Sequence, residues 1–147
     1  MKPILVGIDG SLHSLEALRY AKRVAIAMGL PLRIVSVWHY RSGGFGLPPI
    51  GMVSISLDSE PQVAAQKTID DFVFSALGTD PKVQFGTAAL EGEPADVLIG
   101  QSAGAELLVV GSRGLGSVSS VLLGSVSSPC AQRAHCPVLV FHPPVRN

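Results

Sequence analysis

Leu107-Leu108-Val109-Val110-Gly111-Ser112-Arg113-Gly114, residues 107–114, joins an apolar run to a glycine-rich turn. Nine residues then separate Gly114 from Gly124-Ser125, which opens a helix-like stretch. Glycines let the backbone approach a ligand closely, and amide groups at a helix start point toward anions. The spacing G-x2-G-x9-G-S therefore predicts a phosphate-binding turn between a strand and a helix. The alternative is a flexible glycine-serine loop that joins two helical pieces.

Outward from this turn, apolar runs alternate with helical patterns along the whole chain. The predicted strands are residues 4–8, 32–38, 82–90, 107–110 and 137–141. The predicted helices are residues 12–28, 61–77, 95–102 and 126–134. This alternation predicts an α/β fold with a doubly wound, five-stranded parallel sheet of order 3-2-1-4-5 and helices on both faces. Ligands of such sheets bind where the strand order reverses, here between the first and fourth strands.

Turn-forming residues mark where the helices begin and end. Ser11 is placed to cap the first helix, and Gly29 and Gly78 end the first and second helices. Pro129 is tolerated near a first turn, so it separates residues 118–123 from the last helix. The glycine- and proline-rich segment 40–59 is too long for an ordinary connection. It is interpreted as a mobile flap or as a disordered or partner-covered loop.

The composition limits the classes of protein that need consideration. A length of 147 residues predicts one domain, residues 1–147. Charged residues make up only 15% of the chain against 47% hydrophobic residues, which favours an oligomer. Eleven basic residues balance eleven acidic ones without a basic cluster, so nucleic acid is not an expected partner. No signal peptide and no run of about 18 apolar residues is present, so a cytoplasmic protein without a membrane span is expected.

The cysteines and histidines do not form a recognisable reactive set in the sequence. Cys130 and Cys136 are the only cysteines, and they are interpreted as buried or half-buried apolar residues, with redox sensing as the alternative. The four histidines, at positions 13, 39, 135 and 142, match no catalytic or metal-binding spacing. The sequence therefore assigns no catalytic residue and no protein-bound metal.

Two better-known phosphate motifs do not fit the chain. Ser117 stands where a P-loop requires lysine, so no ammonium group would reach the β- and γ-phosphates. The turn after the first strand, residues 9–12, reads Asp-Gly-Ser-Leu rather than the glycine fingerprint of a dinucleotide fold. The long glycine spacing is the phosphate motif that remains.

Three side chains near the predicted crevice suit a nucleotide. Asp9 can accept hydrogen bonds from ribose hydroxyls, Val37 can form an apolar wall against adenine, and Arg113 can neutralise phosphate charge. Each also has an ordinary alternative: a turn aspartate, a core valine and a solvated arginine.

Several segments together resemble the universal stress protein family. The resemblance covers nearly the whole chain and is carried by residues 4–11 (ILVGIDGS), 91–95 (EGEPA), 108–114 (LVVGSRG), 124–127 (GSVS) and 136–140 (CPVLV). The glycine spacing is similar to that of the ATP-binding branch of the family.

The resemblance implies ATP as the ligand, with magnesium or manganese beside its phosphates. It also implies a homodimer paired through the last strand, residues 137–141. By position, Asp9 would hold ribose, Val37 and Val110 would flank adenine, and the glycine turn would hold ribose and phosphates. The complete set of candidate nucleotide-binding residues is Gly7, Asp9, Val37, Val110, Gly111, Arg113, Gly114, Gly124, Ser125, Val126 and Ser127.

Two classes of function follow from this site. The first is a regulatory stress-response module in which nucleotide occupancy controls the dimer or a partner. The second is a slow ATPase or an ATP-dependent adenylating enzyme, although the latter usually carries Ser-Gly-Gly after its first strand. A phosphoacceptor receiver domain is disfavoured because no acid and no lysine follows Arg113.

Overall fold

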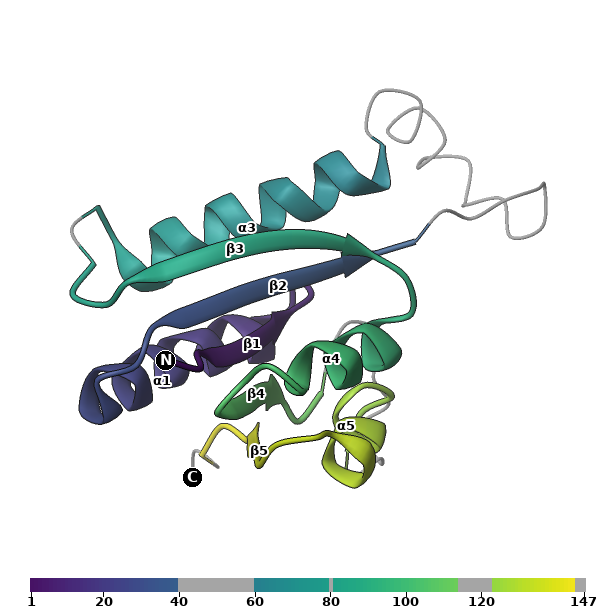
Figure 1. Cartoon of the computed structure of the whole chain (residues 1–147). Coiled ribbons are helices and arrows are strands. Elements are labelled where there is room, and N and C mark those ends of the chain that lie inside the picture. Colours follow the sequence, from purple (N-terminus) through teal and green to yellow (C-terminus); the bar gives the residue numbers. More distant parts are fainter. Residues whose placement is uncertain (40–59, 80, 114–122, 145–147) are drawn as a thin grey trace.

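Strands and helices alternate along the chain in the computed structural model, which describes residues 1–39, 60–79, 81–113 and 123–144 (Figure 1). The strands formed by these residues are β1 (Ile4–Ile8), β2 (Leu32–Trp38), β3 (Phe85–Glu91), β4 (Leu107–Gly111) and β5 (Val138–Phe141). The helices are α1 (Leu12–Met28), α3 (Pro61–Leu77), α4 (Pro94–Ser102) and α5 (Ser127–Arg133).

The five strands form one parallel sheet in the order β3-β2-β1-β4-β5. The predicted fold class and strand order are therefore confirmed. The chain moves outward from β1 to β2 and β3 on one side, then crosses to β4 and β5 on the other. In register, Ile4 lies opposite Leu32 of β2 and Leu107 of β4, so the carboxyl ends of β1 and β4 are neighbours.

The sheet separates two apolar layers because successive strand side chains point to opposite faces. Ile4, Val6 and Ile8 pack with α1 and α3 on one face. Leu5 packs on the other face with Leu98 of α4, in the core that also contains Cys130 of α5. Figure 1 shows the helices covering both faces. Burial on both faces explains why these strands read as continuous apolar runs in the sequence.

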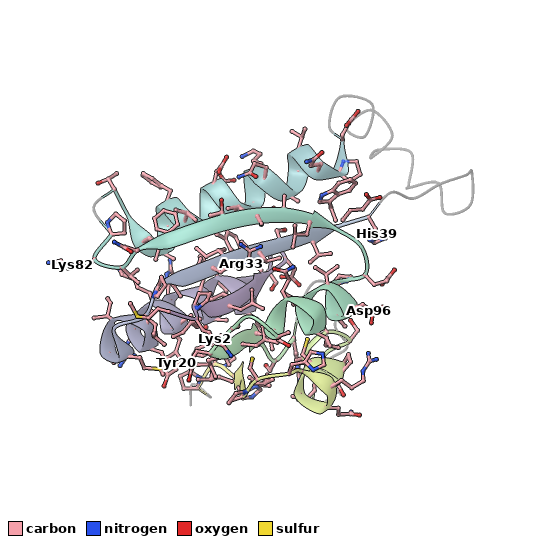
Figure 2. All side chains as sticks on the ribbon, viewed as in Figure 1. Lys2, Tyr20, Arg33, His39, Lys82 and Asp96 are labelled. Carbon is pink, nitrogen blue, oxygen red and sulfur yellow. The ribbon has the colours of Figure 1, made fainter. Side chains whose placement is uncertain are left out.

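Polar side chains connect α4 to the sheet on one side and to α5 on the other. Arg33 of β2, labelled in Figure 2, donates a 3.1 Å hydrogen bond from Nε to Oε1 of Gln101 in α4. Asp96 of α4 lies 3.6 Å from Arg133 of α5 in an exposed ion pair. The first contact satisfies a guanidinium that would otherwise be partly buried without a partner, whereas the second adds little stability in water.

The turn between β1 and α1 is fixed by local chemistry. Gly10 has a φ of 89°, a conformation that other residues adopt only with strain. The Ser11 side chain accepts a hydrogen bond from the amide of Ser14, and Gly29 ends the helix in the left-handed region. The predicted cap and stop residues of this helix are both confirmed.

Some element boundaries differ from the sequence-based prediction. The third strand begins at Phe85 instead of residue 82, because β2, its neighbour in the sheet, begins at Leu32, which lies opposite Phe85. The last helix covers Ser127–Arg133 instead of residues 126–134, and Pro129 is its third residue, as expected near a first turn. The segment 40–59, interpreted as a flap or as a disordered or partner-covered loop, lies outside the described residues. Most of the helical piece predicted at 118–123 also lies outside them.

The described helices also bear on membrane insertion. None of the helices in the described ranges combines the length and the apolar character that crossing a membrane requires.

Candidate functional site

The candidate site lies beyond the carboxyl ends of β1 and β4. Asp9 directly follows β1, and Gly111 is the last residue of β4. The first turn of α1, which begins shortly after Asp9, lies close to Gly111, because His13 of that turn packs against the backbone of Gly111. The structure thus brings Asp9 and Gly111 to the same edge of the sheet, as the topology predicts for a ligand site.

Hydrogen bonds within the turn orient Asp9. Its carboxylate oxygen Oδ1 accepts a 2.9 Å bond from the amide of Ser11, and its own amide donates to Ser14 Oγ at 3.2 Å. The Ser14 hydroxyl in turn donates to the carbonyl of Ser11 at 3.0 Å. The Asp9 side chain is exposed while its backbone is held. A carboxylate with two oxygens can accept further bonds, so this arrangement suits a ligand hydroxyl.

The two valines expected to flank adenine lie on the same face of the sheet. Val37 of β2 and Val110 of β4 both pack in the apolar layer that faces α4 and α5. Val110 is only 3% exposed, so it offers little surface for contact with a ligand. Val37 is half-buried and keeps accessible side-chain surface. Of the two, Val37 is therefore better placed to form an apolar wall.

At two of the candidate glycines, other atoms of the protein approach the backbone closely. A Cβ atom on Gly7 would lie 2.6 Å from Cδ1 of Leu98, so glycine allows α4 to pack directly on β1. A Cβ atom on Gly111 would lie 3.1 Å from the carbonyl carbon of His13 and 3.2 Å from the Arg113 carbonyl oxygen. Packing accounts for glycine at both positions, and a contact of either glycine with a ligand stays a prediction.

The end of β4 is hydrogen-bonded to the segment that precedes α5. The carbonyl of Ser112 accepts a 2.7 Å bond from the amide of Gly124 and a 2.9 Å bond from the hydroxyl of Ser127. The Gly124 amide also lies 2.9 Å from Ser127 Oγ. Ser127 is 1% exposed, so its hydroxyl serves this internal network. We call residues 124–127, together with these bonds to Ser112, the Gly124 turn.

The remaining residues of the Gly124 turn differ in exposure. Ser125 is exposed, whereas Val126 is half-buried and packs in the layer of α4 and α5. The residue in the capping position of α5 is Val126, and no side chain caps that helix. Neither Ser125 nor Ser127 therefore caps this helix. Ser125 is the exposed hydroxyl of this turn.

The two remaining candidates are Arg113 and Gly114, which follow Ser112 in the chain. Arg113 is half-buried, and its Cα would be 3.3 Å from a Cβ atom on Gly124. This places the Arg113 backbone against the Gly124 turn. Gly114 lies outside the described residues.

One cluster at this edge was missed by the sequence analysis. Ser112 Oγ lies 3.0 Å from Nδ1 of His142 and 3.5 Å from Nδ1 of His13. The three residues are separated by 99 and 30 positions in the chain. No local spacing signals such a contact, because only the parallel sheet brings these segments together.

Metal ligands are sparse in the part of the chain that the structure describes. Within it, no three or more His, Cys, Asp or Glu side chains gather closely enough to hold a metal ion.

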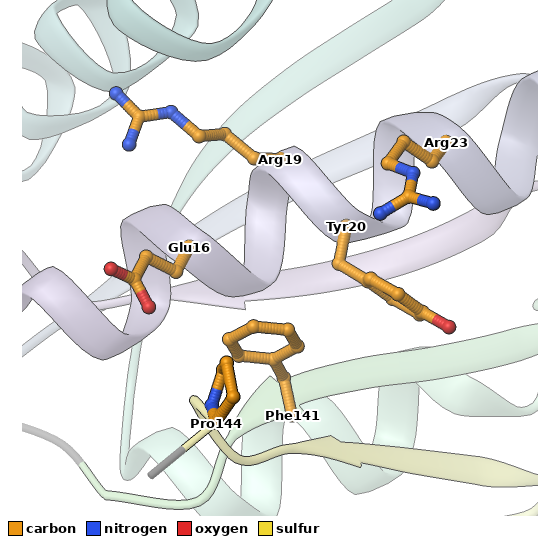
Figure 3. Close-up of a pocket in the computed structure, with 6 residues that line it drawn as sticks. All are labelled: Glu16, Arg19, Tyr20, Arg23, Phe141 and Pro144. Atoms are coloured by element: carbon orange, nitrogen blue, oxygen red, sulfur yellow. The ribbon is translucent and has the colours of Figure 1, made fainter. Parts of the chain in front are cut away.

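A separate cavity of about 400 Å³ lies between α1 and β5 (Figure 3). The rings of Tyr20 and Phe141 within it are 5.5 Å apart, and Arg23 lies 5.5 Å from the centre of the Tyr20 ring. Glu16, Arg19 and Pro144 complete its lining. This cavity is on the α1 side of the sheet, whereas Val37 and Val110 face α4 and α5. It is therefore distinct from the wall expected to hold adenine.

The parallel sheet of order 3-2-1-4-5, flanked by helices, defines a Rossmann-like α/β protein. Comparison with known families narrows this class. The model of the universal stress protein family matches residues 1–142, and the chain belongs to that family.

Individual relatives agree with this assignment. The chain is 32% identical over 141 residues to a universal stress protein of Mycobacterium tuberculosis, covering 96% of this chain and 48% of the relative. It is 32% identical over 152 residues to a universal stress protein of Methanocaldococcus jannaschii, covering 99% of this chain and 85% of that protein. The chain thus spans about half the length of the mycobacterial relatives it matches.

A solved structure with a ligand is also similar to this chain. A crystal structure of a universal stress protein in complex with cAMP has a TM-score of 0.64 and 29% sequence identity. The match covers 96% of each chain.

Proposed function

We propose that this chain is a cytoplasmic regulatory module that binds an adenine nucleotide, ATP in particular, at the carboxyl ends of β1 and β4. One observation carries the proposal. The Asp9 carboxylate and the Gly124 turn flank the same edge of the sheet, and hydrogen bonds within the protein hold each of them. Preorganised groups bind more tightly because less ordering remains to be done on binding.

The parts of a nucleotide have separate places in this proposal. Val37 supplies the apolar wall for adenine, and Asp9 accepts hydrogen bonds from ribose hydroxyls. The exposed hydroxyl of Ser125 and the charge of Arg113 serve the phosphates. The proposed set is completed by residues that shape the surrounding backbone, namely Gly7, Val110, Gly111, Gly124, Val126 and Ser127. Gly114 belongs to the set by the glycine spacing of the sequence. The similar universal stress protein in complex with cAMP supports an adenine nucleotide as the ligand class.

Magnesium or manganese would accompany ATP through the phosphates. Mg²⁺ commonly keeps several waters and binds substrate phosphates with only one or two carboxylates. The described residues contain no group of three or more candidate metal ligands. In this proposal the ion is therefore held mainly by phosphate oxygens and by water.

Asp9→Asn gives the sharpest test of the site. The amide oxygen of asparagine can still accept the bond from Ser11, so the turn is kept while the negative charge is lost. We expect ATP affinity to fall about 10- to 100-fold, the range for a hydrogen bond to a charged group. With 2′,3′-dideoxy-ATP the same substitution should have little effect, because both ribose hydroxyls are absent.

Titration calorimetry with ATP, AMP, cAMP and GTP measures these affinities. Asp96→Asn is the matched control, since Asp96 is an exposed acid on α4. Failure of the wild-type chain to bind any adenine nucleotide at micromolar concentrations would show that the proposal is wrong. Sustained turnover of ATP without a partner would favour the slow ATPase over the regulatory module.

We further propose that two copies pair through the outer edge of β5. Within the described sheet, β5 is bonded only to β4. The carbonyl of Pro137 accepts a bond from Leu108 of β4, and that of Phe141 accepts one from Ser112, directly after β4. The odd-numbered residues of β5 therefore face β4. By alternation, the amide and carbonyl of Val140 face outward. An exposed strand edge of this kind can pair with another chain.

Val140→Pro tests the dimer without removing a bond to β4. Proline lacks the outward N–H and is tolerated on edge strands. We expect sedimentation equilibrium to show a dimer for the wild type and a monomer for the variant. A monomeric wild type, or a variant that remains dimeric, would contradict pairing through this edge.

A further inference from the structure

Two histidines from distant parts of the chain meet at one buried hydroxyl. His13 belongs to the first turn of α1, Ser112 directly follows β4, and His142 directly follows β5. Ser112 is 1% exposed, and its Oγ lies within 3.5 Å of Nδ1 of both imidazoles. The first turn of α1 is held close, since a Cβ atom on Gly111 would be 3.2 Å from that of His13.

The number of hydrogens at this contact constrains the two imidazoles. The Ser112 hydroxyl has one hydrogen, so it can donate to only one Nδ1 at a time. The other Nδ1 must then carry a hydrogen and donate it to Oγ. If both imidazoles are protonated, both Nδ1 atoms are donors. Neither can then accept the hydrogen of the Ser112 hydroxyl. Two positive charges then flank a buried hydroxyl, which disfavours this arrangement.

The backbone of Ser112 transmits its position to the candidate site. Its amide donates a 2.8 Å bond to the carbonyl of Phe141, and its carbonyl holds Gly124 and Ser127. The side chain of Ser112 therefore contacts the histidines while its carbonyl holds the Gly124 turn. A shift of Ser112 would change the hydrogen bonds that hold this turn.

We propose that His13 and His142 are positioning residues that act through Ser112 on the Gly124 turn, so that protonation of both weakens nucleotide binding. This inference rests on the proposed nucleotide site. Imidazole changes charge between about pH 5 and 8, within the range that a cell can reach. The contact thus makes the Gly124 turn responsive to acidification.

Within the described residues, three charged side chains neighbour the contact in the chain. Asp9 precedes α1, Glu16 lies one turn after His13 in α1, and Arg113 directly follows Ser112. The strands β1, β4 and β5 carry no ionisable side chain. Charges of both signs therefore neighbour the contact, from Asp9 and Glu16 on one side and Arg113 on the other.

Asparagine variants separate charge from hydrogen bonding. In His13→Asn and His142→Asn, the amide supplies both a donor and an acceptor near the position of Nδ1 but does not titrate. His135→Asn is the matched control, because His135 is exposed and follows α5 rather than contacting Ser112. Affinity for AMP is measured by calorimetry at pH 7.5 and pH 5.5 for all four proteins.

We expect the wild type and His135→Asn to lose about three- to tenfold more affinity at pH 5.5 than either contact variant, which is the effect of one hydrogen bond. Comparing proteins at each pH cancels the titration of the AMP phosphate itself. An equal pH dependence in all four proteins would overturn the inference.

A second measurement needs no nucleotide. Hydrogen exchange of the Gly124 amide, observed by NMR and corrected for the intrinsic effect of pH, reports directly on its bond to Ser112. We expect protection to fall on acidification in the wild type and to stay constant in His142→Asn. Unchanged protection in the wild type would overturn the inference even if nucleotide binds. A wild type that shows the pH response but binds no nucleotide would refute the proposed function and with it the effect on binding.

Discussion

The amide nitrogen of Gly124 lies 2.7 Å from the carbonyl oxygen of Ser112, across a gap of eleven residues in the chain. This bond joins the end of β4 to the segment before α5, and it leaves little space at Gly124. A Cβ atom there would be 3.2 Å from the same oxygen and 3.3 Å from Cα of Arg113. Glycine is thus favoured at this position, because a side chain would have to displace the neighbouring backbone slightly.

Gly124→Ala should weaken both the turn and the site. The added methyl group must push Ser112 and Gly124 apart by a few tenths of an ångström, which we expect to destabilise the protein by about 1 kcal/mol and to lower nucleotide affinity about tenfold. Urea denaturation and calorimetry measure the two effects. Gly100→Ala in α4 is the control, because its Cβ enters open space and should stabilise the helix by about 0.5–1 kcal/mol. Wild-type values for Gly124→Ala would contradict the tight contact.

Ser125 and Ser127 should respond differently to alanine. Ser127→Ala removes a buried hydroxyl from its bonds to Ser112 and Gly124, so we expect a loss of about 1–2 kcal/mol of stability. Ser125→Ala changes an exposed side chain and should alter stability by less than about 0.5 kcal/mol. If Ser125 contacts phosphate, its variant should nevertheless bind nucleotide several-fold more weakly. Similar unfolding free energies for the two variants would disagree with the observed network.

Gly7→Ala tests the packing of α4 on the sheet. Its Cβ atom would meet Leu98, which is 3% exposed, so we expect a loss of about 1–3 kcal/mol. Leu98→Ala alone should cost about 2–5 kcal/mol. In the double variant the cost of Gly7→Ala should fall, because the clashing side chain is gone. Gly86→Ala in β3, where nothing lies within 4 Å, is the control, and additive costs in the double variant would rule out the direct contact.

The thiol of Cys130 should make stability fall at alkaline pH. Burial raises the pKa of this thiol from 9.0 to about 11. Between these two values the unfolded thiol ionises while the folded one keeps its proton, so rising pH favours unfolding. We expect wild-type stability to decline more steeply over this range than that of Cys130→Ala, measured by urea denaturation at several pH values.

Cys136 supplies the comparison for this pH effect. Burial also raises the pKa of Cys136, although its thiol is less buried than that of Cys130. Cys136→Ser should therefore retain most of the alkaline decline. Parallel curves for wild type and Cys130→Ala would show that Cys130 does not ionise as expected. Both cysteines are free, and Cys130 is buried, which agrees with the apolar role predicted for it from the sequence.

The fold could be predicted from the sequence because its signals are local. The second helix covers Pro61–Leu77 as its apolar stripe predicts, and Gly29 ends the first helix in the expected conformation. Apolar runs such as Ile4–Ile8 identified the buried strands, and their alternation with helices predicted the order 3-2-1-4-5. The start of β3 was wrong by three residues, since it depends on where β2 begins to pair.

The candidate site was predictable only in part. The topology placed Asp9 and Gly111 at one edge of the sheet, because parallel strands bring their carboxyl ends together. The internal roles of Ser127 and Gly7 depend on partners 15 and 91 positions away, namely Ser112 and Leu98. Residue type alone could not distinguish these roles from contacts with a phosphate.

The sequence by itself determined the strand order, most of the strand and helix bounds, and the cap and stop residues of α1. Each of these follows from neighbouring residues, through apolar periodicity, glycine conformation and capping. Only the tertiary structure decided that Ser112 joins His13, His142 and the Gly124 turn at one point. The physical reason is that hydrogen bonds act over about 3 Å, and which distant groups come that close is settled by the packing of the whole sheet and its helices.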